Sequence, residues 1–429
     1  MRDVICGIDV GSRAIRMVAA EFVDGPRNIR IIGAAEVPAE GVRRGTITSM
    51  EDAVAGITSA SEQLERMIGG PVSSAWVSVS GPYVTTRLSR GVVAVARTDG
   101  EVQEGDVERA LEAARAGSTP PNFEVLHIIP RSYALDHQNG VRDPIGMTGS
   151  RLEVEASIIQ GLSSHIRNLT KAIFQSGLEI DDLVLGILAT TEAVTTPRQR
   201  ELGVAVVNIG ATTTSLVVEE EGDVVHLAVI PIGAEHITSD IAIGLRISLD
   251  QAERLKLAVG VAQARGVKKQ EEIDLSAFDA SPASGRGSTE GGEGTSESQR
   301  VSRKYIAEII EARTEEIFEL VDRELTAAGK SGSLPAGCVL VGGGARLPGV
   351  VEVAKRKLRL PVVVGKPSGV DSVVERAFDP TFATAVGLAM WGASAGSGGG
   401  RKRSMVQTVF RPLNTIVDRT KQFVRNVFS

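Results

Sequence analysis

Two segments in opposite halves of the chain share one pattern, and this repetition constrains the fold more than any other feature. Each is an apolar run, a turn of small residues and a second apolar run, which predicts a β-hairpin. The first is Ile8–Ser12 (IDVGS) and the second is Asn208–Ser215 (NIGATTTS). Glycine and hydroxyl residues at a hairpin tip leave backbone N–H groups free to hold phosphate oxygens. Two such hairpins predict a nucleotide held in a cleft between two lobes.

The composition bounds the class of protein. A chain of 429 residues is too long for one core, and 42% hydrophobic and 23% charged residues are typical of a soluble globular protein. The net charge of −6 argues against a nucleic-acid partner. Cys6 and Cys338 lack metal-ligand spacing, so we expect buried thiols in a reducing cytosol. No run approaches the ~20 apolar residues of a membrane span, and a strand follows Met1-Arg2-Asp3 at once, so we expect neither such a span nor a signal peptide.

The hydrophobic periodicity changes along the chain and predicts a division into domains. Alternating strands and helices indicate α/β structure, whereas 84–161 is richer in strands and reads as an inserted α+β subdomain. Residues 276–300 are rich in Gly, Ser and Glu, which predicts a disordered loop. The expected order is lobe I in 1–83, the inserted subdomain in 84–161, lobe I again in 162–203, lobe II in 204–345, a return to lobe I in 346–391, a flexible tether in 392–412 and a terminal helix in 413–429.

Further residues suit a nucleotide site. Asp9 beside the first turn is a candidate to hold Mg²⁺ through water, because this ion takes few carboxylates and keeps several waters. Glu253 and Lys256 lie three apart on a predicted helix and therefore share a face. They could bind ribose hydroxyls or form a solvated ion pair. A third predicted strand ends in Gly342–Gly344.

Five blocks of sequence, in order, carry a family resemblance. They are GIDVGS at 7–12 with Ile15-Arg16, DPIGMTG at 143–149 with RLEV at 151–154, ELGV at 201–204, SDIA at 239–242 through AERLK at 252–256, and GGGARLPG at 342–349. Together they resemble the FtsA family of bacterial cell-division proteins, in the actin-like ATPase superfamily. The DPIGM stretch is the most specific, since general actin-like folds lack it.

The resemblance implies an actin-like fold of two α/β lobes, with an inserted FtsA-type subdomain and with ATP and Mg²⁺ in the cleft. It implies phosphate contacts from both hairpins, ribose contacts from the Glu253–Lys256 pair and adenosine contacts from the glycine run. The nucleotide-binding residues so implied are Asp9, Gly11, Ser12, Arg13, Gly210, Thr212, Thr213, Thr214, Glu253, Lys256, Gly342, Gly343 and Gly344.

Two departures from the family pattern concern hydrolysis. Asn208 replaces the Asp that helps to orient the attacking water in related ATPases, and an amide has no basicity. Gly186 stands where many relatives have a Glu that acts on the same water. Glu192 could substitute only if the backbone brings it near. We therefore expect ATP to be bound but hydrolysed slowly or not at all.

The end of the chain predicts a membrane-binding helix. From Arg401 onward there are seven Lys and Arg but one acid, Asp418. A helix from Leu413 to Phe428 would be about 24 Å long with one apolar face. Such a basic amphipathic helix suits the surface of an anionic membrane. The apolar residues are Leu413, Ile416, Val417, Phe423, Val424, Val427 and Phe428, and the basic ones beside them are Arg419, Lys421 and Arg425.

For an FtsA-like protein these features imply a filament former that ties the tubulin-like protein FtsZ to the inner face of the cell membrane at the division site, with other division proteins as partners. The C-terminal peptide of FtsZ would dock on lobe II, where Lys304 and Arg313 are candidate contacts for its acidic groups. The alternatives are an actin-like assembly protein of type IV pili, or a sugar kinase or chaperone of the same superfamily. A kinase needs a catalytic Asp in the place of Asn208, and a chaperone would carry a further peptide-binding domain.

Overall fold

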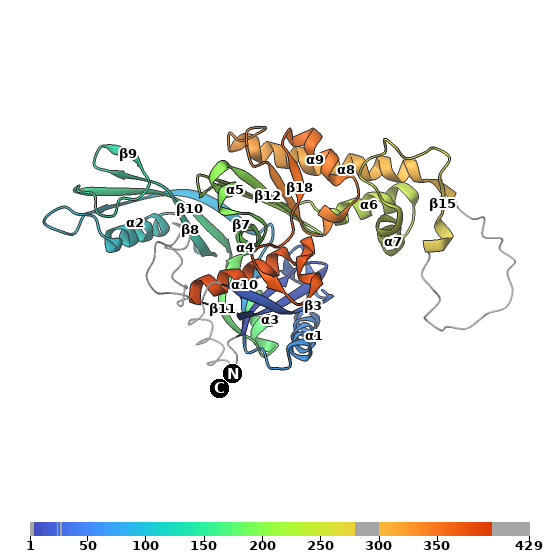
Figure 1. The fold of residues 1–429 in the computed structure, drawn as a ribbon, viewed down its shortest axis with the longest axis horizontal. Coiled ribbons are helices and arrows are strands. Elements are labelled where there is room, and N and C mark those ends of the chain that lie inside the picture. The colour runs from blue at the N-terminus through green and yellow to red at the C-terminus, as the bar shows by residue number, and fades with distance from the viewer. Residues whose placement is uncertain (1–3, 24, 26–27, 279–299, 397–429) are drawn as a thin grey trace.

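The computed structural model describes residues 4–23, 25, 28–278 and 300–396, and it has two lobes with a smaller subdomain that extends from one side (Figure 1). The predicted loop lies outside the described residues except at its ends, and so does the predicted terminal helix. Among the described residues, no helix is long and apolar enough to cross a membrane.

Lobe I is built on a six-stranded sheet with the order β11-β6-β1-β2-β3-β19. Helices cover both faces, because Gly7 approaches α10 while Gly33, on the opposite face, approaches α1. The strands are β1 (Val4–Val10), β2 (Ala14–Phe22), β3 (Ile29–Pro38), β6 (Ser74–Val79), β11 (Glu179–Leu185) and β19 (Asp371–Ser372). The helices are α1 (Met50–Ile68), α3 (Ser163–Gln175), α4 (Gly186–Val194) and α10 (Ala383–Gly396).

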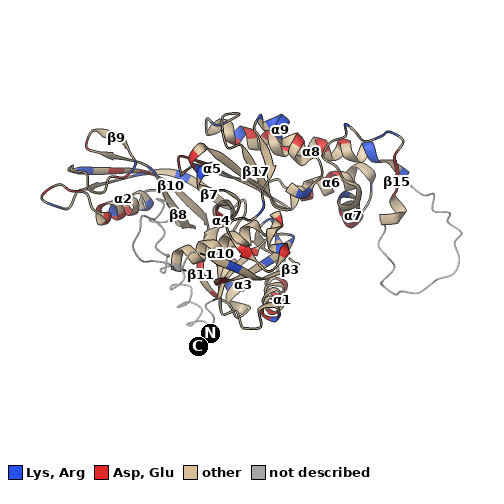
Figure 2. Ribbon diagram, viewed as in Figure 1, with Lys and Arg blue, Asp and Glu red and all other residues tan. Residues whose placement is uncertain are grey.

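Lobe II is built on a five-stranded sheet with the order β14-β13-β12-β17-β18. Its side chains alternate between two cores: Val206 and Val339 pack with lobe I, whereas Val207 and Leu340 pack under the outer helices. The strands are β12 (Val204–Ile209), β13 (Thr214–Glu220), β14 (Asp223–Ile230), β17 (Cys338–Val341) and β18 (Val362–Val364). The outer helices are α6 (Ala234–Leu245), α7 (Leu249–Val259), α8 (Arg303–Ala327) and α9 (Val350–Leu358), and opposite charges line α8 and α9 where they meet (Figure 2).

The inserted subdomain is a four-stranded sheet with the order β7-β10-β8-β9 and one covering helix. A core of its own contains Leu152, Val154 and Ile158. Gly91 lets the helix lie close to the sheet, since a Cβ there would be 1.9 Å from the carbonyl oxygen of Ala110. The elements are β7 (Val84–Ala94), α2 (Glu104–Ala116), β8 (Phe123–Leu135), β9 (Gln138–Val141) and β10 (Arg151–Leu162). The prediction of an inserted α+β subdomain is confirmed.

The remaining elements are short. They are β4 (Val42–Arg43), β5 (Thr46–Ile47), α5 (Pro197–Leu202), β15 (Glu272–Asp274), β16 (Arg300–Ser302) and the 3₁₀ helices at Leu275–Phe278, Gly343–Arg346, Glu375–Phe378 and Pro380–Phe382. Cys6 and Cys338 are buried free thiols, as predicted, and burial raises the pKa of both.

Two expected boundaries are wrong. The return to lobe I does not begin at 346, because β18 pairs with β17 in lobe II and the chain rejoins the lobe I sheet only at β19, which pairs with β3. The tether does not begin at 392, because α10 continues to Gly396. Gly392 packs so closely on Trp76 that a Cβ would lie 2.5 Å from the indole nitrogen. The small residues that indicated a tether therefore allow close helix packing.

Candidate nucleotide site

The two turns predicted to hold phosphate close in the same way. In the first, between β1 and β2, the backbone N–H of Gly11 donates to the carbonyl of Ala14 over 3.1 Å. In the second, between β12 and β13, the N–H of Gly210 donates to the carbonyl of Thr213 over 2.9 Å. A Cβ at either glycine would lie about 3 Å from that acceptor oxygen, at 2.9 and 3.0 Å. The repeated sequence pattern therefore corresponds to one repeated turn.

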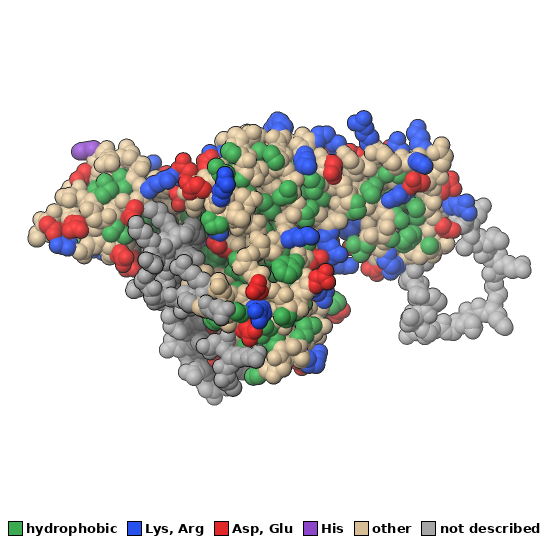
Figure 3. Space-filling model, viewed as in Figure 1, with side chains coloured by type: hydrophobic (Ala, Val, Ile, Leu, Met, Phe, Trp, Pro, Cys, Tyr) green, Lys and Arg blue, Asp and Glu red, His purple; other side chains and the backbone are tan. Residues whose placement is uncertain are grey.

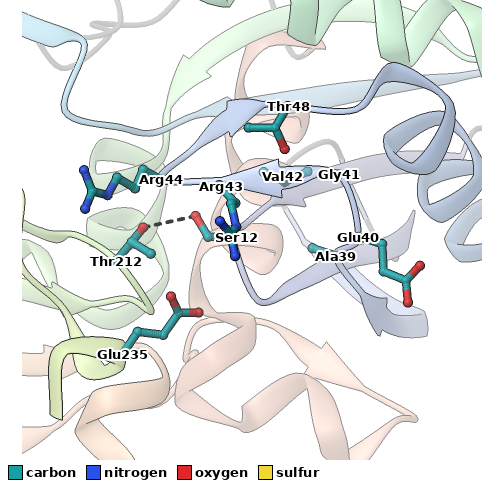
Figure 4. Close-up of a pocket in the computed structure, with 10 residues that line it drawn as sticks. All are labelled: Ser12, Ala39, Glu40, Gly41, Val42, Arg43, Arg44, Thr48, Thr212 and Glu235. Atoms are coloured by element: carbon teal, nitrogen blue, oxygen red, sulfur yellow. Dashed lines mark hydrogen bonds between the residues drawn. The ribbon is translucent and has the colours of Figure 1, made fainter. Parts of the chain in front are cut away.

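The tips of the two hairpins meet across the lobes. The hydroxyl oxygens of Ser12 and Thr212 lie 3.1 Å apart, and the N–H of Gly45, in the turn between β4 and β5, donates to Ser12 Oγ over 2.9 Å. A cavity of about 620 Å³ lies beside the tips (Figure 4). It is lined by Ser12, Ala39, Glu40, Gly41, Val42, Arg43, Arg44, Thr48, Thr212 and Glu235.

Asp9 precedes the first turn and is held on two sides. Its Oδ1 accepts a hydrogen bond of 2.6 Å from Ser78 Oγ, and Arg16 is its cross-strand partner on β2. Burial raises the pKa of the carboxyl, although the Ser78 hydrogen bond and the Arg16 charge oppose the shift. The described residues contain no group of three or more His, Cys, Asp or Glu able to hold a metal by themselves. Asp9 therefore offers a metal a single carboxylate and not a cluster of such side chains, within the described residues.

Glu253 and Lys256 share a face of α7, and the pair is enclosed. The Lys256 ammonium lies 2.7 Å from Glu253 Oε2 and donates to Thr238 and to the carbonyl of Ala234, and only 9% of the residue is exposed. Burial by itself would raise the pKa of Glu253. The hydrogen bonds from Lys256 and Thr238 and the charge of Arg13 outweigh burial, so the net effect is a lowered pKa. The reading of these two residues as a solvated ion pair is therefore wrong.

Arg13 connects the same carboxylate to the other lobe. It lies in the turn of the first hairpin, and its guanidinium is 3.8 Å from Glu253 Oε1. Two residues of the predicted site, from different lobes, thus form an ion pair across the cleft.

The glycine run packs against the end of β12. Gly342 has φ 83°, and a Cβ there would lie 2.3 Å from Asn208 Oδ1. A Cβ at Gly344 would lie equally close to Ile209, whereas one at Gly343 would meet nothing within 4 Å. Gly342 and Gly344 thus permit a close approach of two backbones, and Gly343 faces open space.

Asn208 is partly buried and begins a chain of polar contacts between the lobes. Its Nδ2 donates to Thr384 on α10 over 3.4 Å, and Thr384 contacts Thr190 on α4, whose hydroxyl donates to the carbonyl of Gly186. Gly186 lies close to Ser80, because a Cβ would lie 2.5 Å from Ser80 Oγ, so a side chain at 186 would require Ser80 to move. The two positions that depart from the family pattern therefore lie on the same chain of contacts.

Two residues of the predicted site, Glu192 and Thr214, are not placed to act on a nucleotide. Arg200 donates to Glu192 over 2.7 Å and also lies 3.8 Å from Glu219, at the end of β13 remote from the turn, so Glu192 is not placed to substitute for a missing acid. Thr214 is fully buried, and its hydroxyl donates to the carbonyl of Ile232, so it is not available to a phosphate.

The structure adds residues that the sequence pattern did not reveal. Ser78, Thr238 and Thr384 bind the predicted residues from other elements, and no motif marks them. Arg43 and Arg44 line the cavity from the β4–β5 turn. Their signal was a pair of arginines followed by a glycine.

Solved structures with low sequence identity share this architecture. A structure of a PilM–PilN type IV pilus biogenesis complex aligns with a TM-score of 0.64 at 17% identity, covering 91% of this chain and 98% of that one. MreB5 of Spiroplasma citri, solved with ADP, aligns with a TM-score of 0.51 at 13% identity, covering 92% and 99%. The two lobes and the paired turns thus define an actin-like fold.

Sequence comparison then identifies the family. The family model for cell division protein FtsA matches residues 205–387, and that for the SHS2 domain inserted in FtsA matches 81–160. Curated FtsA proteins are similar along most of the chain: that of Pseudomonas aeruginosa is 33% identical over 99% of this chain and 98% of its own, and that of Bacillus subtilis is 35% identical over 90% and 82%. The chain belongs to the FtsA family of cell-division proteins. The pilus alternative is not favoured, because that likeness is one of fold alone.

Proposed function

We propose that this protein binds ATP between its lobes, polymerises at the inner face of the cell membrane and anchors FtsZ filaments there during division. The main observation in favour of a nucleotide site is the contact between Ser12 and Thr212. It brings together two turns, one from each lobe, that are suited to bind phosphate. Each turn offers backbone N–H groups and a hydroxyl on one side of the contact. ATP between them would link the lobes and favour one closed arrangement.

The residues present also suit Mg²⁺. Asp9 offers one carboxylate, and the hydroxyls of Ser12 and Thr212 lie near the expected phosphates. Mg²⁺ is commonly held by one or two carboxylates together with waters and phosphate oxygens. The bound ion would offset the charge of the phosphates. Arg16 would help to keep the Asp9 carboxylate ionised.

Hydrolysis should be slow. The amide of Asn208 points its Nδ2 at Thr384, and its oxygen lies against Gly342. An amide in that position cannot take a proton from water. Gly186, the other position that departs from the family pattern, has no side chain that could supply an acid instead. We infer that ATP acts here chiefly as a ligand that sets the closure of the lobes.

The FtsZ peptide would bind to the outer part of lobe II. Apolar side chains are exposed there on α6 and α7, notably Leu257 and Ile243, which is 76% exposed. Figure 3 shows hydrophobic and basic side chains together over this part of lobe II. Tyr305 on α8 is also exposed beside Lys304, which has no ion pair within the described residues. Arg313 is held by both oxygens of Asp240 at 2.6 and 2.9 Å, so it would support α6 instead of binding the peptide. Lys304 remains the better candidate contact.

Attachment to the membrane would come from the terminal helix at 413–429, beyond the described residues. Its basic and apolar faces suit an anionic surface. Through this helix, a filament of the chain would hold FtsZ polymers at the division site, and the inserted subdomain would be free for other division proteins.

Two measurements test the proposal. Titration calorimetry with ATP and Mg²⁺ should show saturable binding to the purified chain, and no binding would overturn the nucleotide site. Fluorescence anisotropy with a labelled FtsZ tail peptide should show binding that Lys304→Ala weakens about tenfold. Lys171→Ala, which removes an exposed lysine of α3, is the matched control and should have no effect. A lack of binding between the wild-type protein and the peptide would contradict the role in division.

A further inference from the structure

Most positive charges around the predicted nucleotide site are already paired. Lys256 and Arg13 both contact Glu253, and Arg16 lies 3.4 Å from Glu36. Arg43 and Arg44 differ, because neither guanidinium lies within 4.0 Å of a carboxylate in the described part of the chain. Both line the cavity beside the hairpin tips. They are therefore the cations left to meet a strongly charged ligand there.

The β4–β5 turn that carries them has a defined position. Arg44 and Gly45 have φ values of 51° and 68°, and a Cβ at Gly45 would lie 2.2 Å from the carbonyl oxygen of Ser80. The N–H of Gly45 donates to Ser12 Oγ. The turn is thus packed on lobe I and bonded to the tip of the first hairpin. Figure 4 shows Arg43 directed toward Ser12 and Arg44 extended away from it.

The cavity lies at one end of the predicted site. Its lining includes Ser12 and Thr212 but none of Gly342–Gly344, Glu253 or Lys256, which are proposed to surround the nucleoside. A phosphate chain that passes between the hairpin tips would therefore end in this cavity. Because the hydroxyl of Ser12 already accepts from Gly45, its own hydrogen is the one available to a phosphate oxygen.

Two carboxylates that line the cavity favour a cation there in addition to the proposed Mg²⁺. Glu235, in the first turn of α6, lines the cavity from lobe II, and Glu40 lines it from lobe I. A terminal phosphate would be repelled by these carboxylates unless a positive group faced it. An arginine fork matches phosphate oxygens in geometry as well as in charge.

We propose that Arg43 contacts the terminal phosphate of a bound nucleoside triphosphate and makes the site prefer triphosphate over diphosphate. This inference rests on the nucleotide site proposed above. It assigns the preference to a short turn outside both hairpins.

The test compares ATP with ADP, each with Mg²⁺, by titration calorimetry on the full chain. Arg43→Gln should weaken ATP binding at least tenfold and ADP binding less than threefold, so that the ratio of the two dissociation constants falls toward one. Arg43→Lys should restore part of the preference, because the charge is kept. Arg87→Gln removes an exposed arginine of β7 in the inserted subdomain and should change neither affinity. Thermal unfolding of each variant without nucleotide should match wild type.

The outcomes separate the two proposals. If wild-type protein binds neither nucleotide, the nucleotide site itself is wrong. If wild type binds ATP and Arg43→Gln leaves the ATP-to-ADP ratio unchanged, the site stands and the role of Arg43 is overturned. An equal loss for both nucleotides also overturns it, because Arg43 would then act on a phosphate that both share.

Discussion

The hydroxyl of Ser12 lies 3.1 Å from the hydroxyl of Thr212, although 200 positions separate the two residues in the chain. One belongs to the first hairpin of lobe I and the other to the first hairpin of lobe II. Their hydrogen bond occupies the place where the proposed phosphates would pass. A bound nucleotide would replace this direct contact with two contacts to phosphate oxygens.

Removal of either hydroxyl should weaken nucleotide binding. Ser12→Ala removes a donor to an ionised acceptor, and such bonds contribute about 1.5–3 kcal/mol, so we expect ATP affinity to fall roughly ten- to a hundredfold. Thr212→Val should act in the same direction. Ser89→Ala, which loses one hydrogen bond to Ala114 in the inserted subdomain, is the control. Unchanged affinity in Ser12→Ala would place the phosphates elsewhere.

Restoration of the acid at position 208 should speed hydrolysis. Asn208→Asp would lose the hydrogen bond that the amide donates to Thr384, and it would offer a basic oxygen near the proposed site of water attack. General-base catalysis typically contributes 10²–10⁴-fold, and because Gly186 still lacks its acid we expect about a tenfold gain. Steady-state phosphate release measures it, with Asn122→Asp as the control. Equal rates in wild type and Asn208→Asp would show that the amide does not limit turnover.

Glu219 should make stability depend on pH near neutrality. Burial raises its pKa to about 7 from the ordinary 4.5, and Glu192 and Asp223 add to the shift while Arg200 opposes it. Between pH 4.5 and 7 the folded protein keeps a proton that the unfolded chain loses, so the free energy of unfolding falls as the pH rises. The loss is at most about 3 kcal/mol, at 1.36 kcal/mol for each pKa unit.

Glu219→Gln cannot ionise and should therefore gain stability over wild type at pH 8 but not at pH 4.5. Urea unfolding at both pH values measures the difference. Glu308→Gln, which neutralises an exposed carboxylate of α8, should not show it. A constant difference between Glu219→Gln and wild type at the two pH values would mean that Glu219 is ionised throughout.

Deletion of 401–429 should abolish co-sedimentation with vesicles that contain anionic lipid. A charge on the apolar face of the helix expected at 413–429 should have nearly the same effect, because burial of an ionised group among acyl chains is costly. Val424→Asp makes this change, and Asn426→Asp introduces the same charge on the polar face. The prediction fails if Val424→Asp and Asn426→Asp sediment equally well.

Several local features followed from the order of residues. Period-two apolar runs with small residues between them predicted both hairpins, and helical spacing placed Glu253 beside Lys256. The same logic failed at Gly392, because glycine and alanine serve equally well in a tether and in a close helix contact. It also failed at 346–364, where nothing local indicates which sheet a short strand joins.

What the sequence by itself determined were the elements, the paired turns and the family, because these depend on local geometry and on motifs that can be read in order. Only the tertiary structure decided which groups face one another. Arg13 lies near Glu253, and Gly45 near Ser12, because separate elements pack together in space. Local sequence patterns do not indicate which elements will pack together. The assignment of Arg43 to the cavity depends on the same packing.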